Sequence, residues 1–168
     1  MLHEISVDNL TFNPFQLIGK DWYLLTAGTE AGWNTMTASW GTLGIFWGKP
    51  VVNSFIRTSR HTLDFVERED TFTLSFFDES YRAALQFCGS HSGRDCDKAK
   101  ETGLTPCFLD GTTAFAEAKL VLVCKKLYCY DIKPEEMIDP SLQKWYADGM
   151  GGYHRCFFGE ICKVYAAD

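Results

Sequence analysis

The sequence predicts a mainly β protein, an antiparallel barrel with short helices at its periphery. Three observations support this class. Strand-like segments outnumber helical ones, each helical segment is short and joins two strands, and aromatic residues make up 15% of the chain. The 168 residues suffice for one domain with a sizeable core, and no repeat or linker divides them, so residues 1–168 are predicted to form a single domain.

The strands are predicted from runs of aromatic, aliphatic and β-branched residues between glycine, proline and polar positions. Residues 71–77 alternate polar and apolar side chains, which predicts a half-buried strand. Residues 114–131 are predicted to be either one bent strand or two strands joined at a bulge. Gly41, Gly44 and Gly48 are expected to interrupt regular structure. The remaining predicted strands are residues 22–28, 34–40, 51–56 and 153–165.

The helices are predicted at the connections between these strands. Asn13 caps a single turn that is expected to stop at Gly19. Thr62 is the predicted N-cap of a helix over residues 63–67, which has Asp64 in its first turn. Asp78 or Ser80 should cap the helix that carries Tyr81, Ala84, Leu85 and Cys88 on one face, and a last short helix is expected over residues 142–146.

Composition excludes several classes of function. A net charge of −6 argues against nucleic acid as the main partner. No apolar run is long enough to span a bilayer, and the N-terminus has no signal-peptide pattern. The seven cysteines are dispersed, with no C-x-x-C pair, which predicts free thiols in a reducing cytoplasm and no zinc site.

The segment 34–40 carries a stripe of hydroxyl groups. In a strand, Thr35, Thr37 and Ser39 share one face. The other face then carries Asn34, Met36, Ala38 and Trp40. Hydroxyl-rich strands are common on solvated surfaces, so this stripe alone does not indicate a ligand.

A basic turn over residues 57–62 is more specific. It gathers two arginines, a histidine and three hydroxyl residues within six positions: Arg57, Thr58, Ser59, Arg60, His61 and Thr62. A helix start offers free N–H groups, and arginine forks match phosphate oxygens. The stripe and the turn together suit one ligand that has a flat polar ring and a phosphate.

Four segments in this order resemble the flavin reductase-like family, which includes the flavoredoxins. They are residues 34–40, 50–52 followed by 57–62, 92–98 and 158–161. The resemblance covers most of the chain. It implies an FMN-binding split β-barrel, antiparallel and of Greek-key type, with FMN as the cofactor. It also implies a homodimer with FMN near the subunit interface, and the apolar run Ile45-Phe46-Trp47 is compatible with such a contact.

The resemblance assigns candidate FMN ligands to three groups. Arg57, Ser59, Arg60 and Thr62 would hold the phosphate, with Thr58 and His61 as further candidates. The ring edge would meet backbone or side-chain groups of Asn34, Thr35, Met36, Thr37, Ala38, Ser39 and Trp40. Ser92, Gly93, Arg94 and Lys98 would contact the flavin or its phosphate, although loop charges such as these are usually only solvated.

Two functions from different classes follow from this resemblance. The first is an NAD(P)H-dependent flavin reductase, with NADH or NADPH as donor. The alternative is a flavoredoxin-like carrier that passes electrons between redox protein partners without binding nicotinamide; the acidic charge and the missing G-x-G-x-x-G motif favour it slightly. Because the flavin carries the chemistry, no catalytic side chain is assigned. His154, which follows a glycine-rich segment, is a candidate for gating the site.

Overall fold

The computed structural model describes residues 1–168. Its strands are β1 (His3–Ile5), β2 (Tyr23–Thr29), β3 (Gly32–Ala38), β4 (Gly41–Phe46), β5 (Lys49–Arg57), β6 (Thr71–Phe76), β7 (Pro106–Leu109), β8 (Thr112–Phe115), β9 (Leu120–Asp131) and β10 (His154–Ala166). Its helices are α1 (Pro14–Gln16), α2 (Thr62–Arg68), α3 (Arg82–Ser90) and α4 (Lys98–Thr102). Further 3₁₀ segments are η1 (Val7–Asn9), η3 (Glu79–Tyr81), η4 (Pro134–Glu136) and η5 (Pro140–Tyr146), and η2 (Leu17–Asp21) is a short π-helix.

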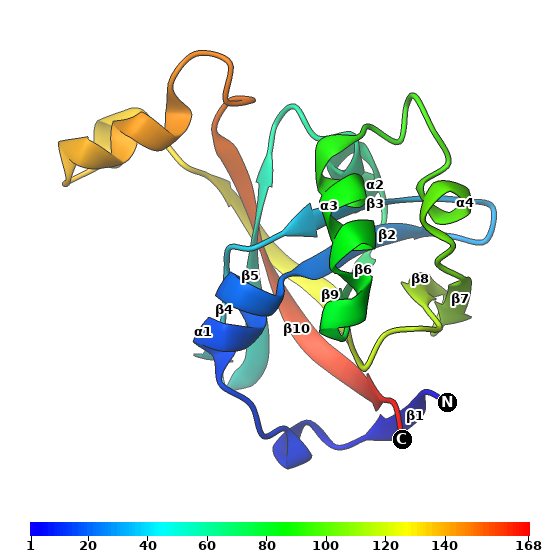
Figure 1. Cartoon of the computed structure of the whole chain (residues 1–168). Coiled ribbons are helices and arrows are strands. Elements are labelled where there is room, and N and C mark those ends of the chain that lie inside the picture. Colours follow the sequence, from blue (N-terminus) through cyan, green and yellow to red (C-terminus); the bar gives the residue numbers. More distant parts are fainter.

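The main sheet is antiparallel and follows the order β3-β2-β6-β9-β10-β5-β4, with β1 paired to β10. Its two end strands, β3 and β4, are consecutive in sequence and are joined by Ser39 and Trp40. The sheet therefore bends until its two edges meet at this connection without pairing to each other (Figure 1). Tyr23 Oη on β2 donates to the carbonyl of Trp40 at 2.7 Å, which supports the junction. The predicted split antiparallel barrel is confirmed.

Two apolar clusters lie on opposite faces of the sheet. The larger, of 20 buried residues, includes Leu25, Phe76 and Leu122. The smaller, of 10, packs outer-face residues such as Val121 against α3 and the β7–β8 hairpin. Because both faces are covered, β6 is buried on both sides, and the prediction of a half-buried strand is wrong. On its polar outer face, Thr73 Oγ1 donates to the carbonyl of Thr113 at 2.6 Å, whereas the buried Ser75 hydroxyl has no partner.

Several predicted boundaries differ from the structure. The first helix passes Gly19 and continues through η2 to Asp21. Gly41 and Gly44 lie within β4, where an edge strand paired only with β5 tolerates them. The segment 114–131 is two separate strands, β8 and β9. Neither Asp78 nor Ser80 caps α3, because the single turn η3 precedes it and no side chain caps either.

A long connection between β9 and β10, residues 132–153, carries η4 and η5. We call it the arm. Figure 1 shows it projecting from the end of the barrel, away from the chain termini. Arg57 at the end of β5 holds the arm, because Nη1 donates to the carbonyl of Gly152 and Nη2 to that of Trp145, both at 2.9 Å.

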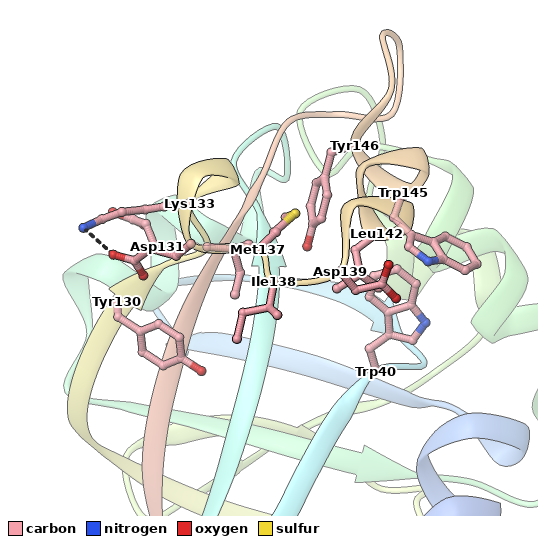
Figure 2. A pocket seen from close by; sticks show the side chains of 12 residues that line it. Trp40, Tyr130, Asp131, Lys133, Met137, Ile138, Asp139, Leu142, Trp145 and Tyr146 are labelled. Carbon is pink, nitrogen blue, oxygen red and sulfur yellow. Dashed lines mark hydrogen bonds and ion pairs between the residues drawn. The ribbon is translucent and has the colours of Figure 1, made fainter.

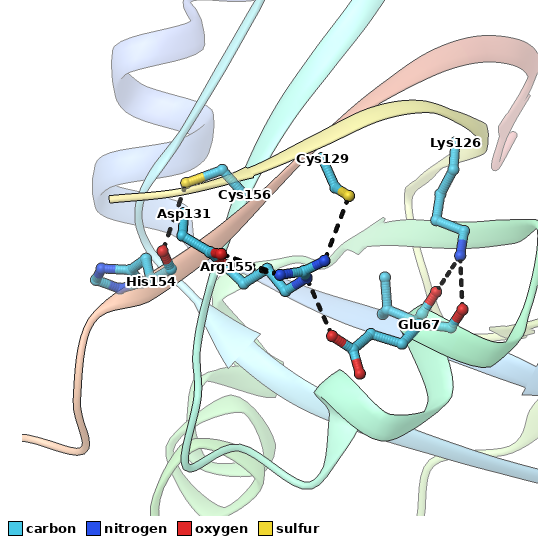
Figure 3. Close-up of polar contacts among 8 residues, drawn as sticks. Glu67, Lys126, Cys129, Asp131, His154, Arg155 and Cys156 are labelled. Carbon is cyan, nitrogen blue, oxygen red and sulfur yellow. Dashed lines mark hydrogen bonds and ion pairs between the residues drawn. The ribbon is translucent and has the colours of Figure 1, made fainter. Parts of the chain in front are cut away.

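An ion network ties the end of α2 to β9 and β10 (Figure 3). The Arg155 guanidinium lies 3.0 Å from Glu67 and 3.1 Å from Asp131. Lys126 Nζ donates to the carbonyls of Val66 and Glu67 at 2.6 and 3.0 Å. The network holds α2, and with it the basic turn that precedes α2, against the sheet.

No helix of the structure has the length and apolar character needed to cross a membrane.

Candidate functional site

A polar cavity of about 350 Å³ forms where β3, the basic turn, the α3–α4 loop and the arm meet. Ten of the predicted FMN ligands line it: Asn34, Met36, Arg57, Ser59, Arg60, His61, Thr62, Ser92, Gly93 and Lys98. Five residues that were not predicted complete it: Ser90, His91, Gly149, Met150 and Gly151. The fold therefore brings together four segments that are separate in the sequence.

The charge of this cavity opposes the charge of the whole chain. Arg57, Arg60 and Lys98 line it, and none of the 22 aspartates and glutamates does, although the chain has a net charge of −6. Hydroxyl and amide groups supply the remaining polar surface. This donor set fits an anion such as a phosphate.

Thr62 lies inside α2 as its first residue, so its predicted role as N-cap is wrong. His61 precedes the helix, and no side chain caps it. The Thr62 hydroxyl instead accepts a hydrogen bond from Asn34 Nδ2 at 2.8 Å, and the Thr62 side chain is 1% exposed. This bond connects the first half of β3 to the end of the basic turn.

The orientation of the hydroxyl stripe corrects the sequence-based expectation. The Thr35 hydroxyl shares a 2.8 Å hydrogen bond with that of Thr26, and the Thr37 hydroxyl donates to the carbonyl of Leu85 in α3. These side chains therefore face the packed outer side of the sheet, and Ala38 belongs to the barrel core. Asn34 and Met36, on the opposite face of β3, are the strand residues that reach the polar cavity.

Both arginines of the basic turn already have partners, but not all of their donors are used. Arg60 Nη1 donates to the carbonyl of Gly89 at 2.7 Å, and burial together with Arg57 lowers the pKa of Arg60. Each guanidinium has five N–H donors. Arg57 uses two of them on the arm, and the rest remain for an anion.

Lys98 is the most buried cation of the cavity, with 5% of its surface exposed. Its Nζ donates to the carbonyls of Thr35 and Cys88, both at 2.8 Å, and burial lowers its pKa. An ammonium group has three N–H donors, so one is left after these two bonds. Lys98 thus supports β3 from behind and can still bind a ligand in the cavity.

Besides the outer-face and core residues of β3, two further predicted ligands do not line the polar cavity. Arg94 Nη2 forms a 3.0 Å ion pair with Asp64, and its side chain is largely solvated. The N–H of Thr58 donates to the carbonyl of Tyr153 at 3.1 Å, which helps to seat the arm. The structure does not bring either residue into the cavity.

Glycines let the cavity walls approach its polar side chains. A Cβ atom on Gly93 would overlap the side-chain amide of Asn34, and one on Gly151 would lie 2.5 Å from Ser59 Oγ. Gly151 also has a φ of +83°, which favours glycine. The glycine-rich run 149–152 was the one sequence signal for this wall, but nothing local indicated that it would fold over the basic turn.

A second cavity, of about 470 Å³, lies at the end of β3 and is lined by Ser39, Trp40, Tyr146 and His154 among others. His154 pairs with Arg57 across β5 and β10, and its Nδ1 shares a 2.8 Å hydrogen bond with Tyr146 Oη. Burial, helped by Arg57, lowers the pKa of His154 to about 4. Its place in a strand gives no sign of the expected mobility, and its gating role stays a prediction.

A third and larger cavity, of about 760 Å³, shares Trp40 and Tyr146 with the second (Figure 2). It lies between the arm and the ends of β9 and β3. Figure 2 shows Met137 and Ile138 of the arm pointing into it, opposite Tyr130. Trp40 and Trp145 meet edge to face, with ring centroids 5.3 Å apart.

The fold and the sequence were compared with known proteins. A family model described as the flavin reductase like domain matches residues 16–168. No curated protein matches the chain.

Solved structures of similar fold include three described here. The flavoredoxin from Methanosarcina acetivorans has a TM-score of 0.71 and 18% identity over 99% of this chain and 76% of its own. The flavoredoxin of Desulfovibrio vulgaris (Miyazaki F) has a TM-score of 0.69 and 19% identity over 99% and 78%. The NADH:FAD oxidoreductase SgcE6 from Streptomyces globisporus C-1027 has a TM-score of 0.66 and 18% identity over 88% and 75%.

Proposed function

This chain belongs to the flavin reductase-like domain family, and from this we propose that it binds FMN and acts as an NAD(P)H-dependent oxidoreductase of the flavin reductase type. The observation that carries the proposal is the polar cavity of about 350 Å³. Its lining residues come from four separate segments and include three cations and no carboxylate. Phosphate recognition explains that charge better than solvation does, since the rest of the chain is acidic.

The phosphate of FMN would lie against the basic turn. Arg57 and Arg60 supply charged donors, and Ser59 adds a hydroxyl next to the wall formed by Gly151. Asn34 also lines this space, and its amide is held between Gly93 and the Thr62 hydroxyl. These guanidinium, hydroxyl and amide groups are hydrogen-bond donors, and the phosphate dianion of FMN carries several oxygens that can accept from them.

The ring of FMN would follow β3. Met36 offers an apolar surface, and the remaining donor of Lys98 Nζ can bind a polar ring edge. Bound FMN supplies the redox chemistry, because it accepts a hydride and passes on one or two electrons. The residues of the chain bind and orient FMN and neutralise the charge of its phosphate. Tyr146 and His154 remain available to hold a proton near the end of β3.

A flavoredoxin-like electron carrier is the second candidate. The acidic surface favours it, because a charged face can orient a protein partner, and two of the structures compared above are flavoredoxins. The NADH:FAD oxidoreductase of the same fold favours the reductase. NADH and NADPH are equal candidates as donor.

The test is anaerobic stopped-flow absorbance of FMN-loaded protein mixed with NADH or NADPH. Loss of the oxidised flavin band within seconds supports the reductase. No loss with either nucleotide, together with reduction by a small ferredoxin, supports the carrier. A protein that leaves the fluorescence of added FMN unchanged and purifies without colour would contradict both.

We also propose a homodimer with FMN near the subunit interface. Ile45, Phe46 and Trp47 at the β4–β5 turn are 76%, 44% and 53% exposed, and the two aromatic rings stack at 3.9 Å. A reducing, cytoplasmic setting is part of the proposal. It is supported by seven cysteines that are all free.

A further inference from the structure

The cavity at the end of β3, which we call the aromatic cavity, differs in chemistry from the polar cavity. It measures about 470 Å³ and is lined by Pro14, Phe15, Ile18, Gly19, Ser39, Trp40, Gly41, Phe55, Ile132, Tyr146 and His154. None of these residues is an aspartate, glutamate, lysine or arginine. The size and the aromatic walls suit a ligand of one or two rings.

The aromatic cavity is electrically neutral at physiological pH. His154 is its one titratable group near neutrality, and burial lowers the pKa of this imidazole to about 4, so the ring stays uncharged. Burial also raises the pKa of Tyr146, which keeps its hydroxyl protonated. Arg57, whose charge reaches His154, does not line this cavity and donates to carbonyls of the arm. An anionic ligand would therefore lose its hydration here without gaining a direct ion pair, whereas a neutral ring has no charge to desolvate.

A small number of polar groups interrupt the apolar lining. Ser39 contributes a hydroxyl, and Tyr146 Oη is bonded to His154 Nδ1 at 2.8 Å. That bond leaves Nε2 of His154 without a protein partner, on a side chain that is only 6% exposed. Each of these groups can donate to, or accept from, a hydroxyl or carbonyl oxygen. The rings of Trp40 and His154 lie 5.3 Å apart and offer a surface for stacking.

The aromatic cavity lies beside the proposed FMN site. Met36 on β3 lines the polar cavity, and Ser39, directly after the end of β3, lines the aromatic one, so the two are three residues or about 10 Å apart along the extended chain. Arg57 separates the two, since its guanidinium lies 5.9 Å from the Trp40 ring and 5.3 Å from the Tyr146 ring. A molecule in the aromatic cavity would therefore lie next to one held by β3 and the basic turn.

We propose that the aromatic cavity binds a neutral aromatic substrate that carries a hydroxyl or carbonyl oxygen, of the phenol, aryl ketone or quinone class. Its role as a substrate rests on the FMN-dependent function proposed above. Stacking on Trp40 and hydrogen bonds from Ser39 and His154 hold the ring and its oxygen. Because no cation lines the cavity, carboxylated analogues bind more weakly.

The test compares two probes of equal size, 4-hydroxyacetophenone and the anion 4-hydroxybenzoate, by isothermal titration of the whole chain with and without FMN. Gly19→Phe fills the aromatic cavity, because a Cβ at Gly19 meets no atom within 4 Å. Gly32→Phe is the matched control, since Gly32 is equally open but lies outside every cavity described here. Ser39→Ala removes one hydrogen bond without filling space.

We expect 4-hydroxyacetophenone to bind wild type and Gly32→Phe equally, at least tenfold more tightly than 4-hydroxybenzoate. Gly19→Phe should weaken it at least tenfold, and Ser39→Ala roughly fivefold. FMN affinity should be the same in wild type, Gly19→Phe and Gly32→Phe. Circular dichroism of Gly19→Phe checks its fold, and Ser39→Ala tests the same site should that variant not fold.

Equal or tighter binding of 4-hydroxybenzoate, or full affinity in both Gly19→Phe and Ser39→Ala, would overturn the inference. Binding of NADH in the aromatic cavity would also overturn the inference. It would be seen if Gly19→Phe lost affinity for NADH while 4-hydroxyacetophenone bound neither wild type nor any variant. Binding of 4-hydroxyacetophenone without any binding of FMN would uphold the ligand class and refute the proposed function. Binding of FMN without any binding of 4-hydroxyacetophenone would refute the ligand class and leave the proposed function standing.

Discussion

Asn34 Nδ2 donates a 2.8 Å hydrogen bond to the hydroxyl of Thr62, and this bond joins β3 to the first residue of α2. The two residues are 28 positions apart and both are buried. The bond fixes the basic turn against the strand, so the geometry of the polar cavity depends on it.

Asn34→Ala should lower the free energy of unfolding by about 1–3 kcal/mol, because it leaves the buried Thr62 hydroxyl without its donor. Thr62→Val should cost a similar amount, and the double variant should cost less than the sum of the two. Urea denaturation monitored by tryptophan fluorescence measures all three. Thr11→Val, on an exposed residue, is the control. Strict additivity would show that the two side chains are not coupled.

Gly93→Ala should weaken FMN binding at least tenfold, because the added Cβ would overlap the Asn34 amide and displace the 91–93 loop. The backbone of Gly93 has no positive φ, so strain in the loop itself does not contribute. Titration of FMN fluorescence gives the affinity. Gly44→Ala, where a Cβ meets nothing within 4 Å, should bind like wild type. Wild-type affinity in Gly93→Ala would contradict the proposed position of the site.

Arg60→Ala should weaken FMN binding roughly 10- to 100-fold, the value of one charge-assisted hydrogen bond. Arg60→Lys should restore part of this loss, because the charge remains while the fork is lost. Arg94→Ala is the matched control: Arg94 pairs with Asp64 outside the cavity, so its removal should change the affinity less than threefold. The same fluorescence titration measures each variant, and a larger loss in Arg94→Ala than in Arg60→Ala would refute this assignment.

His154 should make stability depend on pH below neutrality. Its pKa is about 4 in the folded chain and about 6.5 when unfolded, so the unfolded state binds more protons between these values. The free energy of unfolding should therefore fall as the pH decreases from 6.5 to 4, by on the order of 2–3 kcal/mol. Urea midpoints measured at a series of pH values give the curve. His154→Gln, which cannot be protonated, should flatten it; an unchanged slope in that variant would assign the effect to other groups.

Ile45→Asp should shift the proposed dimer toward monomers, because it places a charge among the exposed apolar residues of the β4–β5 turn. Sedimentation velocity across a range of protein concentrations measures the change. Ile138→Asp is the control, since Ile138 is 99% exposed but lies on the arm. Dissociation by Ile138→Asp alone would move the subunit interface to the arm, and a wild-type monomer would exclude the dimer.

The basic turn shows how much of the candidate site a short sequence pattern can predict. Arg57, Ser59 and Arg60 were predicted to form a phosphate site from residue types within six positions, and the structure brings all three to one cavity. Arg94, which has the same charge and lies in an equally polar segment, is solvated and paired with Asp64. The difference between these arginines depends on which carboxylate lies nearby in space, and that information is not local.

The sequence by itself determined the β class, the order of the main elements and the residues of the basic turn, because these follow from side-chain types and short spacings. Only the tertiary structure decided which face of β3 lines the polar cavity. Alternation gives a strand two faces, and the packing of α3 on Thr37 assigns the hydroxyl face to the packed outer side of the sheet. The position of the arm was likewise decided only by the tertiary structure. Its glycines cover the basic turn because Arg57 donates to the carbonyls of Gly152 and Trp145, and these contacts span about 90 residues of chain.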